Sequence, residues 1–154
     1  MFRGINTVNL DAKNRFAIPT KYRSQLTDDG CHSVVLTIDT DEQCLLLYPL
    51  KVWEDIEQKL QALPSFQPAT RRIQRLLIGH ATEIDMDSHG RLLLPQLLKE
   101  HAGLDKKMIL VGQGKKFEIW SEACWQEQRS QWLNLGVSTS EEGNTLDVLS
   151  TISV

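Results

Sequence analysis

Residues 8–23 read VNLDAKNRFAIPTKYR, and residues 84–99 read IDMDSHGRLLLPQLLK. The two stretches are variants of one pattern, in which an aspartate, an arginine and a proline recur at the same spacing. The recurring residues are Asp11, Arg15 and Pro19 in the first stretch and Asp87, Arg91 and Pro95 in the second. A unit that occurs twice indicates a fold built from two similar halves.

Each copy predicts a strand, a tight turn, a second strand and a short helix. Apolar residues alternate on both sides of the turn, as in half-buried strands. The aspartate that opens the turn can accept N–H groups from residues just after it. Asn14 and Gly90 occupy the last turn position, where φ is often positive. Pro19 and Pro95 end the second strand, because proline cannot donate to a ladder and suits the start of a helix.

A second common pattern follows each copy, namely two apolar strands and then a helix, which is amphipathic in the first half. The predicted elements are a short helix at 20–26, strands at 33–38 and 44–48 and a helix at 50–63 in the first half, a connecting helix at 69–78, and then a short helix at 96–102, strands at 107–111 and 117–120 and a helix at 122–135.

One copy of about 45 residues has too little apolar surface to form a core alone. We therefore expect an α+β fold, mainly β with short helices, in which two tandem units interleave their β-hairpins and pack as an intrachain pseudo-dimer. The predicted boundaries are 5–52 for the first unit, 53–80 for connecting helices, 81–124 for the second unit, and 125–154 for a C-terminal helix and polar tail.

Composition fits a globular protein, with 41% hydrophobic and 24% charged residues. No apolar run approaches the roughly 20 residues of a membrane span. The N-terminus lacks the apolar segment of a signal peptide, so we expect a cytoplasmic location without membrane association. The three cysteines show no paired metal spacing, and we expect them to be reduced, with at least two in the core.

The net charge of −3 is unevenly distributed. The basic residues Arg3, Lys13, Arg15, Lys21 and Arg23 face only Asp11 within residues 1–27, whereas the segment 121–154 is acidic. A local basic face decides attraction to phosphate, whatever the total charge.

Arg15 and Arg91 are the candidate functional residues, since each follows a tight turn that holds its base stiffly. Arginine binds guanine O6 and N7 through two N–H groups, and it also binds phosphates. The alternative is that each arginine pairs with the aspartate four residues before it and closes the turn. The two interpretations are compatible and stay open at this point.

A metal site or an enzyme is a rival interpretation. Glu83, Asp85, Asp87 and His89 alternate, so a strand could point several of them to one side. The first copy has Lys13 at the position of His89, and lysine is no ligand for a divalent metal. No nucleophile–base pair or phosphate loop is visible. We therefore expect no enzyme activity, no metal, no cofactor and no small-molecule substrate.

The chain resembles the MraZ family of bacterial transcription regulators over its whole length apart from the tail. The resemblance is carried by MFRG at the start, NLDAKNR, CLLLYP at 44–49, RRIQRLLIGHA at 71–81 and DSHGRLLLP at 87–95. Asn14 stands where a glycine is common in the family. The resemblance implies two AbrB-like swapped-hairpin units per chain and assembly into a ring-shaped homo-oligomer.

The resemblance also implies the partner, which is double-stranded DNA. The family binds repeated promoter elements, and regulates its own transcription and the adjacent division and cell-wall gene cluster, so we expect a nucleoid-associated repressor. The expected DNA-binding residues are Arg15, Arg91, Lys13, Arg3, Lys21 and Arg23, and the expected turn-forming residues are Asp11, Asn14, Asp87 and Gly90. The alternative is a ring-forming scaffold or antitoxin-like protein with incidental DNA contact.

Overall fold

A computed structural model describes residues 1–27 and 30–136 of the chain. The elements of the first half are β1 (Phe2–Asn9), β2 (Arg15–Ala17), α1 (Thr20–Leu26), β3 (Ser33–Ile38), β4 (Leu45–Pro49) and α2 (Leu50–Gln61). After the connecting α3 (Pro68–Leu77), the second half repeats this order as β5 (Thr82–Asp85), β6 (Arg91–Leu93), α4 (Gln96–His101), β7 (Lys107–Gly114), β8 (Phe117–Ser121) and α5 (Glu122–Leu135).

The predicted elements are all present, with ends that differ by a few residues. The helix expected to reach residue 63 ends at Gln61, and the strand expected at 107–111 continues to Gly114. Pro19 and Pro95 directly precede α1 and α4, with φ of −52° and −61°. Because proline has no N–H to leave unpaired and a fixed φ, it starts both helices at equivalent places.

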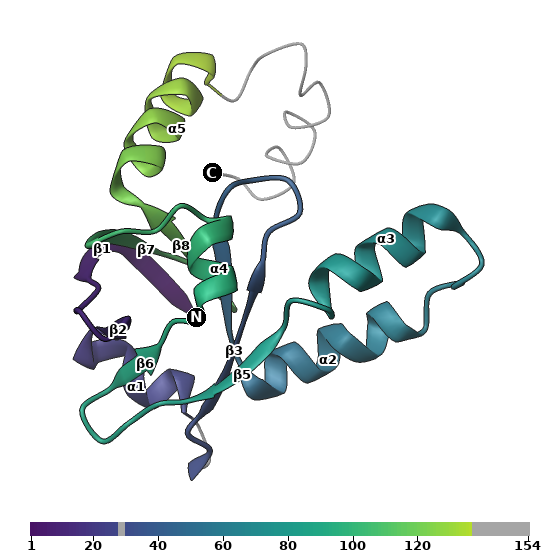
Figure 1. Ribbon diagram of the computed structural model, residues 1–154, viewed down its shortest axis with the longest axis horizontal. Helices are drawn as coiled ribbons and strands as arrows, with labels where there is room; N and C mark the ends of the chain where they lie inside the picture. Colours follow the sequence, from purple (N-terminus) through teal and green to yellow (C-terminus); the bar gives the residue numbers. More distant parts are fainter. Residues whose placement is uncertain (28–29, 137–154) are drawn as a thin grey trace. The chain divides into compact units, whose positions relative to one another are not determined.

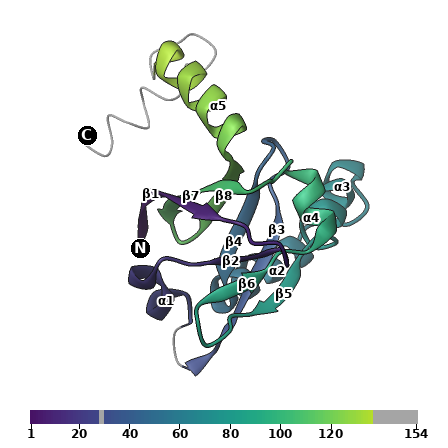
Figure 2. The ribbon, with the colours of Figure 1, turned by 60° about the vertical axis from the view of Figure 1, so that its left-hand side comes forward.

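The strands pair between the two halves of the chain. β1 pairs with β7, β2 with β6, and β3 with β5, all antiparallel. The six-stranded sheet has the order β1-β7-β8-β4-β3-β5, which reads the same after the halves are exchanged, and β2-β6 forms a separate two-stranded ribbon (Figure 2). The α+β class and the intrachain pseudo-dimer are therefore confirmed, and neither strand–turn–strand segment forms a hairpin ladder of its own.

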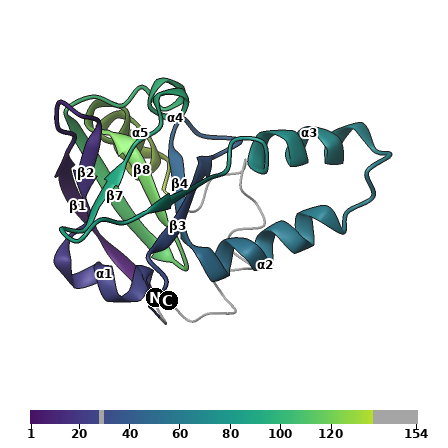
Figure 3. The ribbon, with the colours of Figure 1, turned by 60° about the horizontal axis from the view of Figure 1, so that its bottom comes forward.

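Alternating side chains divide the core between the two faces of the sheet. Leu36 and Leu47 face the ribbon, α1 and α4, where Phe16 and Leu92 complete the larger cluster. The other face carries the smaller cluster, which joins the sheet to α2 and α3 through Val35, Leu46, Tyr48 and Trp53. α2 and α3 form an antiparallel pair that projects away from the sheet (Figures 1 and 3).

By its packing the chain divides into Met1–Glu122 and a segment that starts at Ala123. In the second segment, the rings of Trp125 and Trp132 lie 6.2 Å apart along α5. The polar tail predicted after Gly136 lies outside the described residues.

None of the helices in the described ranges has the length and apolar content that a bilayer span requires. The three cysteines are free, as expected. The expectation of two core cysteines is wrong, because Cys44 is buried whereas Cys31 and Cys124 are half-buried.

Candidate functional site

Turn 1, residues 11–15, is closed by the carboxylate of Asp11. Its Oδ1 accepts the backbone N–H groups of Lys13 (2.8 Å) and Arg15 (2.9 Å). Its Oδ2 accepts the Nε–H of Arg15 at 3.2 Å. In the main chain, the N–H of Asp11 donates to the carbonyl of Arg15 (2.8 Å) and that of Asn14 to the carbonyl of Asp11 (3.1 Å). Turn 1 therefore fixes the base of the arginine side chain.

Turn 2, residues 87–91, repeats this set of hydrogen bonds. Asp87 Oδ1 accepts the N–H groups of His89 (2.9 Å) and Arg91 (2.8 Å), and Oδ2 accepts Arg91 Nε–H at 2.8 Å. The N–H groups of Asp87 and Gly90 donate to the carbonyls of Arg91 and Asp87, each at 3.0 Å. The local aspartate–arginine pairing that the sequence allowed is thus present in both copies.

These hydrogen bonds keep the two aspartates ionised. The backbone N–H of Arg91, followed by its side chain, lowers the pKa of Asp87 to about 2 from an ordinary value of 3.8. The backbone N–H of Arg15 lowers the pKa of Asp11 in the same way. At neutral pH each turn therefore holds a carboxylate against a guanidinium group.

The β2–β6 ribbon places both arginines on one outer face. Arg15 lies opposite Leu93, and Ala17 lies opposite Arg91, so these four side chains share a face. The Cα atoms of the two arginines are diagonal neighbours, about 7–8 Å apart in such a ladder. The side chains of Arg15 and Arg91 are 30% and 34% exposed, and Leu93 is 56% exposed. Solvent therefore reaches both guanidinium groups, although each one also bonds to the aspartate of its own turn.

Each turn is braced by a helix from the opposite half. Lys99 on α4 donates from Nζ to Asn14 Oδ1 at 2.9 Å. Arg23 on α1 lies against Gly90, where a Cβ would overlap its side chain, and donates from Nε to the carbonyl of Ile18 at 2.7 Å. Asn14 and Gly90 both have positive φ, 61° and 73°. Lys99 was not predicted, although it aligns with Arg23 in the repeat.

The predicted basic residues do not all lie together. Lys13 is exposed on turn 1, and Arg23 lies at turn 2. Arg3 stands near the start of β1, at the opposite end of that strand from turn 1. Lys21 is on α1, with its Nζ 4.9 Å from the centre of the Tyr22 ring. Arg15 and Arg91 thus share the outer face of the ribbon, while Lys13 lies on turn 1 at one end of it and Arg23 lies at turn 2 at the other.

The predicted alternation of acids on β5 does not assemble a metal-ligand set. Asp85 accepts the hydroxyl of Ser33 at 2.6 Å, and Asp87 is occupied within turn 2. Among the described residues, three ligand groups meet elsewhere, at Asp39, Cys44 and Glu118, all within 4.8 Å of one another.

Burial raises the pKa of both the Cys44 thiol and the Glu118 carboxyl group, and the indole of Trp120 donates to Glu118 at 3.0 Å. A metal needs the thiolate, so burial here favours protonated, packed groups over a ligand set.

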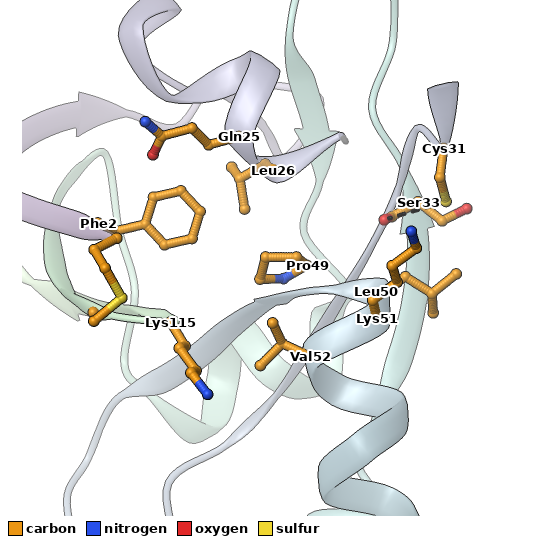
Figure 4. A pocket seen from close by; sticks show the side chains of 12 residues that line it. Phe2, Gln25, Leu26, Cys31, Ser33, Pro49, Leu50, Lys51, Val52 and Lys115 are labelled. Carbon is orange, nitrogen blue, oxygen red and sulfur yellow. Dashed lines mark hydrogen bonds between the residues drawn. The ribbon is translucent and has the colours of Figure 1, made fainter. Parts of the chain in front are cut away.

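An open pocket of about 340 Å³ lies between the start of β1, the end of α1 and the start of α2 (Figure 4). Phe2, Leu26 and Val52 form much of its wall. Cys31 and Ser33 also line it, but the contact between them runs from the Cys31 thiol to the Ser33 backbone carbonyl, at 4.0 Å. Within the described residues, the Cys31 thiol makes no hydrogen bond to a basic side chain of the kind that nucleophilic catalysis requires.

A pseudo-dimer with strands exchanged between its halves, carrying one arginine turn per half on an exposed ribbon, defines a protein of the swapped-hairpin β class. The family profile described as "MraZ protein, putative antitoxin-like" matches residues 1–76 and again 77–148. The chain therefore belongs to the MraZ family, as the resemblance predicted, and it holds two MraZ units in tandem.

Curated relatives extend over most of the chain. A protein of Coxiella burnetii is 55% identical over 133 residues, covering 86% of this chain and 88% of the relative. One from Legionella pneumophila is 54% identical over the same shares. One from Halorhodospira halophila is 49% identical over 142 residues, or 92% and 93%. All three are named "Transcriptional regulator MraZ".

Proposed function

We propose that this chain is a sequence-specific DNA-binding transcription regulator that reads the major groove with the outer face of the β2–β6 ribbon. The supporting observation is that Arg15 and Arg91, on stiff turns from different halves, share that face and remain accessible. The major groove accepts a two-stranded β-ribbon, and several regulators bind DNA in this way.

The chemistry of the face suits base edges flanked by phosphates. Each guanidinium group has five N–H donors, and the aspartate of its turn accepts the one on Nε, so the terminal nitrogens stay available for guanine O6 and N7. Leu93 projects an apolar side chain that can contact a thymine methyl group. Lys13 is placed for a phosphate, while Arg3 and Lys21 contribute longer-range attraction.

We further propose that the protein acts as a ring-shaped homo-oligomer whose subunits meet through the projecting α2–α3 pair. The pair carries exposed acids on α2, Glu54 and Asp55, and exposed bases on α3. The bases are Arg71, Arg72 and Arg75, and no ion pair within the described residues engages them. Phe66, between the two helices, is 80% exposed. Opposite charges and an apolar tip complement the same surface on a second copy.

A ring would bind DNA more tightly than one subunit can. It presents the same face repeatedly to regularly spaced DNA elements, so each later contact forms at high effective concentration. The proposed targets are the repeats in the protein's own promoter, upstream of the division and cell-wall gene cluster, which it would repress from a nucleoid-associated, cytoplasmic location. The names of the relatives support a role in transcription regulation.

The test is a gel-shift titration of DNA from immediately upstream of the gene, with a scrambled duplex as comparison. Arg15→Ala and Arg91→Ala should each weaken operator binding roughly 5- to 150-fold, the range of one base-reading arginine, and should reduce the preference over scrambled DNA by the same factor. Arg3→Ala removes the same charge at the far end of β1 and should leave the preference intact. Unchanged affinity of Arg15→Ala for the operator would refute the proposal.

A ring-forming scaffold, or an antitoxin-like protein as the family description suggests, is the second candidate, favoured by the exposed charges and the exposed Phe66 of the α2–α3 pair. Such a protein would show only salt-sensitive, sequence-independent DNA binding. A regulator should retain its preference for the operator at moderate salt, and Arg15→Ala should raise transcription from the promoter in cells.

A further inference from the structure

Beside turn 1 the surface contains a hollow of about 500 Å³ whose rim is rich in lysine. It lies between the end of β1, turn 1, α4 and the start of β7, and three of its lining residues are Lys99, Lys106 and Lys107. Lys106 and Lys107 are exposed. None of these three lysines belongs to the set proposed above as the reading face.

The pairing of β1 with β7 brings these lysines to the turn. Asn9 lies opposite Lys107, and the N–H of Leu10 donates to the carbonyl of Lys106 at 2.8 Å. Lys99 is anchored at the same place by its bond to Asn14, which uses one of the three donors of its ammonium group. The sheet register and the bond to Asn14 therefore place three lysines on the same side of turn 1.

Two acids, Asp11 and Asp105, also line the hollow, but the lysines outweigh them. Asp11 has both carboxylate oxygens engaged by turn 1, one of them by the guanidinium of Arg15. Asp105 is exposed on the rim. Three lysines against Asp105, with Lys13 exposed on the adjoining turn, make this the cationic flank of the ribbon.

The corresponding flank of turn 2 has different chemistry. There Asp85 occupies the place of Asn9 and Ser33 that of Lys107, and the two side chains bond to each other at 2.6 Å. His32 takes the place of Lys106, since its carbonyl accepts the N–H of Met86 just as that of Lys106 accepts Leu10. Arg23 is the counterpart of Lys99 at turn 2, but a histidine and a serine replace the other two lysines there, and the Asp85 carboxylate repels an anion.

We infer that the hollow beside turn 1 binds a phosphodiester group of the DNA backbone through Lys99, Lys106 and Lys107, and that the flank of turn 2 does not. This site rests on the proposed function, because its occupant is the duplex whose groove the ribbon enters. Flexible ammonium groups act as point charges suited to phosphate, and they position a protein on DNA without reading sequence. Turn 1 is therefore the electrostatic anchor of each chain.

The experiment measures DNA affinity against salt concentration for the full chain and two matched variants. Lys107→Gln and Lys115→Gln each remove one exposed lysine, at the start of β7 and directly after its end. Lys107→Gln should weaken binding to operator and scrambled DNA by the same factor and reduce the salt slope by about 0.9. The double variant Lys106→Gln/Lys107→Gln should deepen both effects, and Lys115→Gln should leave the slope unchanged.

Two results would overturn the site. One is that Lys106→Gln/Lys107→Gln keeps the wild-type melting temperature and also keeps the wild-type dependence of DNA affinity on salt. The other is an equal loss in Lys115→Gln, which would mean general charge attraction. Added inorganic polyphosphate should compete with DNA for wild type more effectively than for the double variant, and equal competition would contradict the site.

Failure of the site is distinguishable from failure of the proposed function. If Arg15→Ala prefers the operator less than wild type does, while the lysine variants bind normally, the ribbon reads DNA and only the anchor is wrong. If wild type shows no preference for the operator, the proposed function as a sequence-specific regulator is overturned.

Discussion

Turn 1 and turn 2 have the same internal hydrogen bonds and different surroundings. In both, the aspartate accepts two backbone N–H groups and an arginine Nε–H. Turn 1 is tied to the opposite half by a side-chain hydrogen bond and flanked by lysines, whereas turn 2 is packed under Arg23 and flanked by an acid. The repeated residues set the shape of the turn, and the unrepeated ones set the charge and packing around it.

The largest expected effect tests whether the halves are one folding unit. Phe16 and Leu92 are equivalent residues that lie opposite each other in the ribbon, 1% and 0% exposed. Leu92→Ala should lower the free energy of unfolding by about 2–5 kcal/mol, because it leaves a cavity in the shared core. Calorimetry should show one transition that moves as a whole.

Phe16→Ala is the matched variant in the other half, and it should shift the same single transition by about 3–5 kcal/mol. Two separate transitions in either variant would contradict the interleaved core, since each half would then be melting alone.

A smaller effect separates the two turns by the residue that precedes their arginine, Asn14 in turn 1 and Gly90 in turn 2. Gly90→Ala should destabilise the fold by about 1–3 kcal/mol, because the new Cβ meets Arg23 and φ is 73°. Asn14→Gly should cost less than about 1 kcal/mol, since glycine accepts the φ of 61° and only the bond to Lys99 is lost. Chemical denaturation measures both, and equal losses would mean that the two braces are equivalent.

Acid should destabilise both turns, and the aspartate of turn 2 has the larger pKa shift. The folded chain holds the pKa of Asp87 at about 2, below its ordinary 3.8, so its ionised form stabilises the fold fully above pH 4. That contribution is lost as pH falls from about 4 towards 2, and Asp11 acts in the same direction.

The Asp87→Asn variant should therefore melt with a weaker pH dependence than wild type over this interval, in melting curves recorded at several pH values. A pH dependence as steep as that of wild type would show that Asp87 contributes nothing to it.

The smallest expected effect concerns the brace of turn 1. Lys99→Met keeps most of the side-chain length and removes the bond to Asn14, which should cost about 0.5 kcal/mol of stability. The cost should vanish when Asn14→Gly is already present, because the two changes break the same bond. Additive losses in this double-mutant cycle would mean that the bond does not form in solution.

The repeat alone predicted most of the fold. The spacing of Asp11, Arg15 and Pro19, copied in the second half, located the turns, the short strands and the helices that follow the prolines. The small apolar surface of one copy predicts that the two units pack together. The sequence does not show which strands pair, and the pairing of β1 with β7 came only from the structure. Asp11 and Asp87 were identified because their hydrogen bonds are local.

The braces and the lysine hollow could not be predicted from the sequence in the same way. Lys99 lies 85 residues from Asn14, and no local pattern links them. Lys106 and Lys107 lie beside turn 1 only because of the register between β1 and β7. Contacts that depend on register are set by the whole sheet, whereas the repeat reports only what each half does by itself.

The central claim is that Arg15 and Arg91 read bases from the outer face of one ribbon, and methylation interference on the operator tests it most directly. Methyl groups on guanine N7 block the major-groove acceptor that an arginine needs. The account predicts that N7 methylation of particular guanines prevents binding of wild type, and that Arg15→Ala becomes indifferent to a subset of them. Binding that ignores N7 methylation, or an identical pattern for wild type and Arg15→Ala, would contradict it.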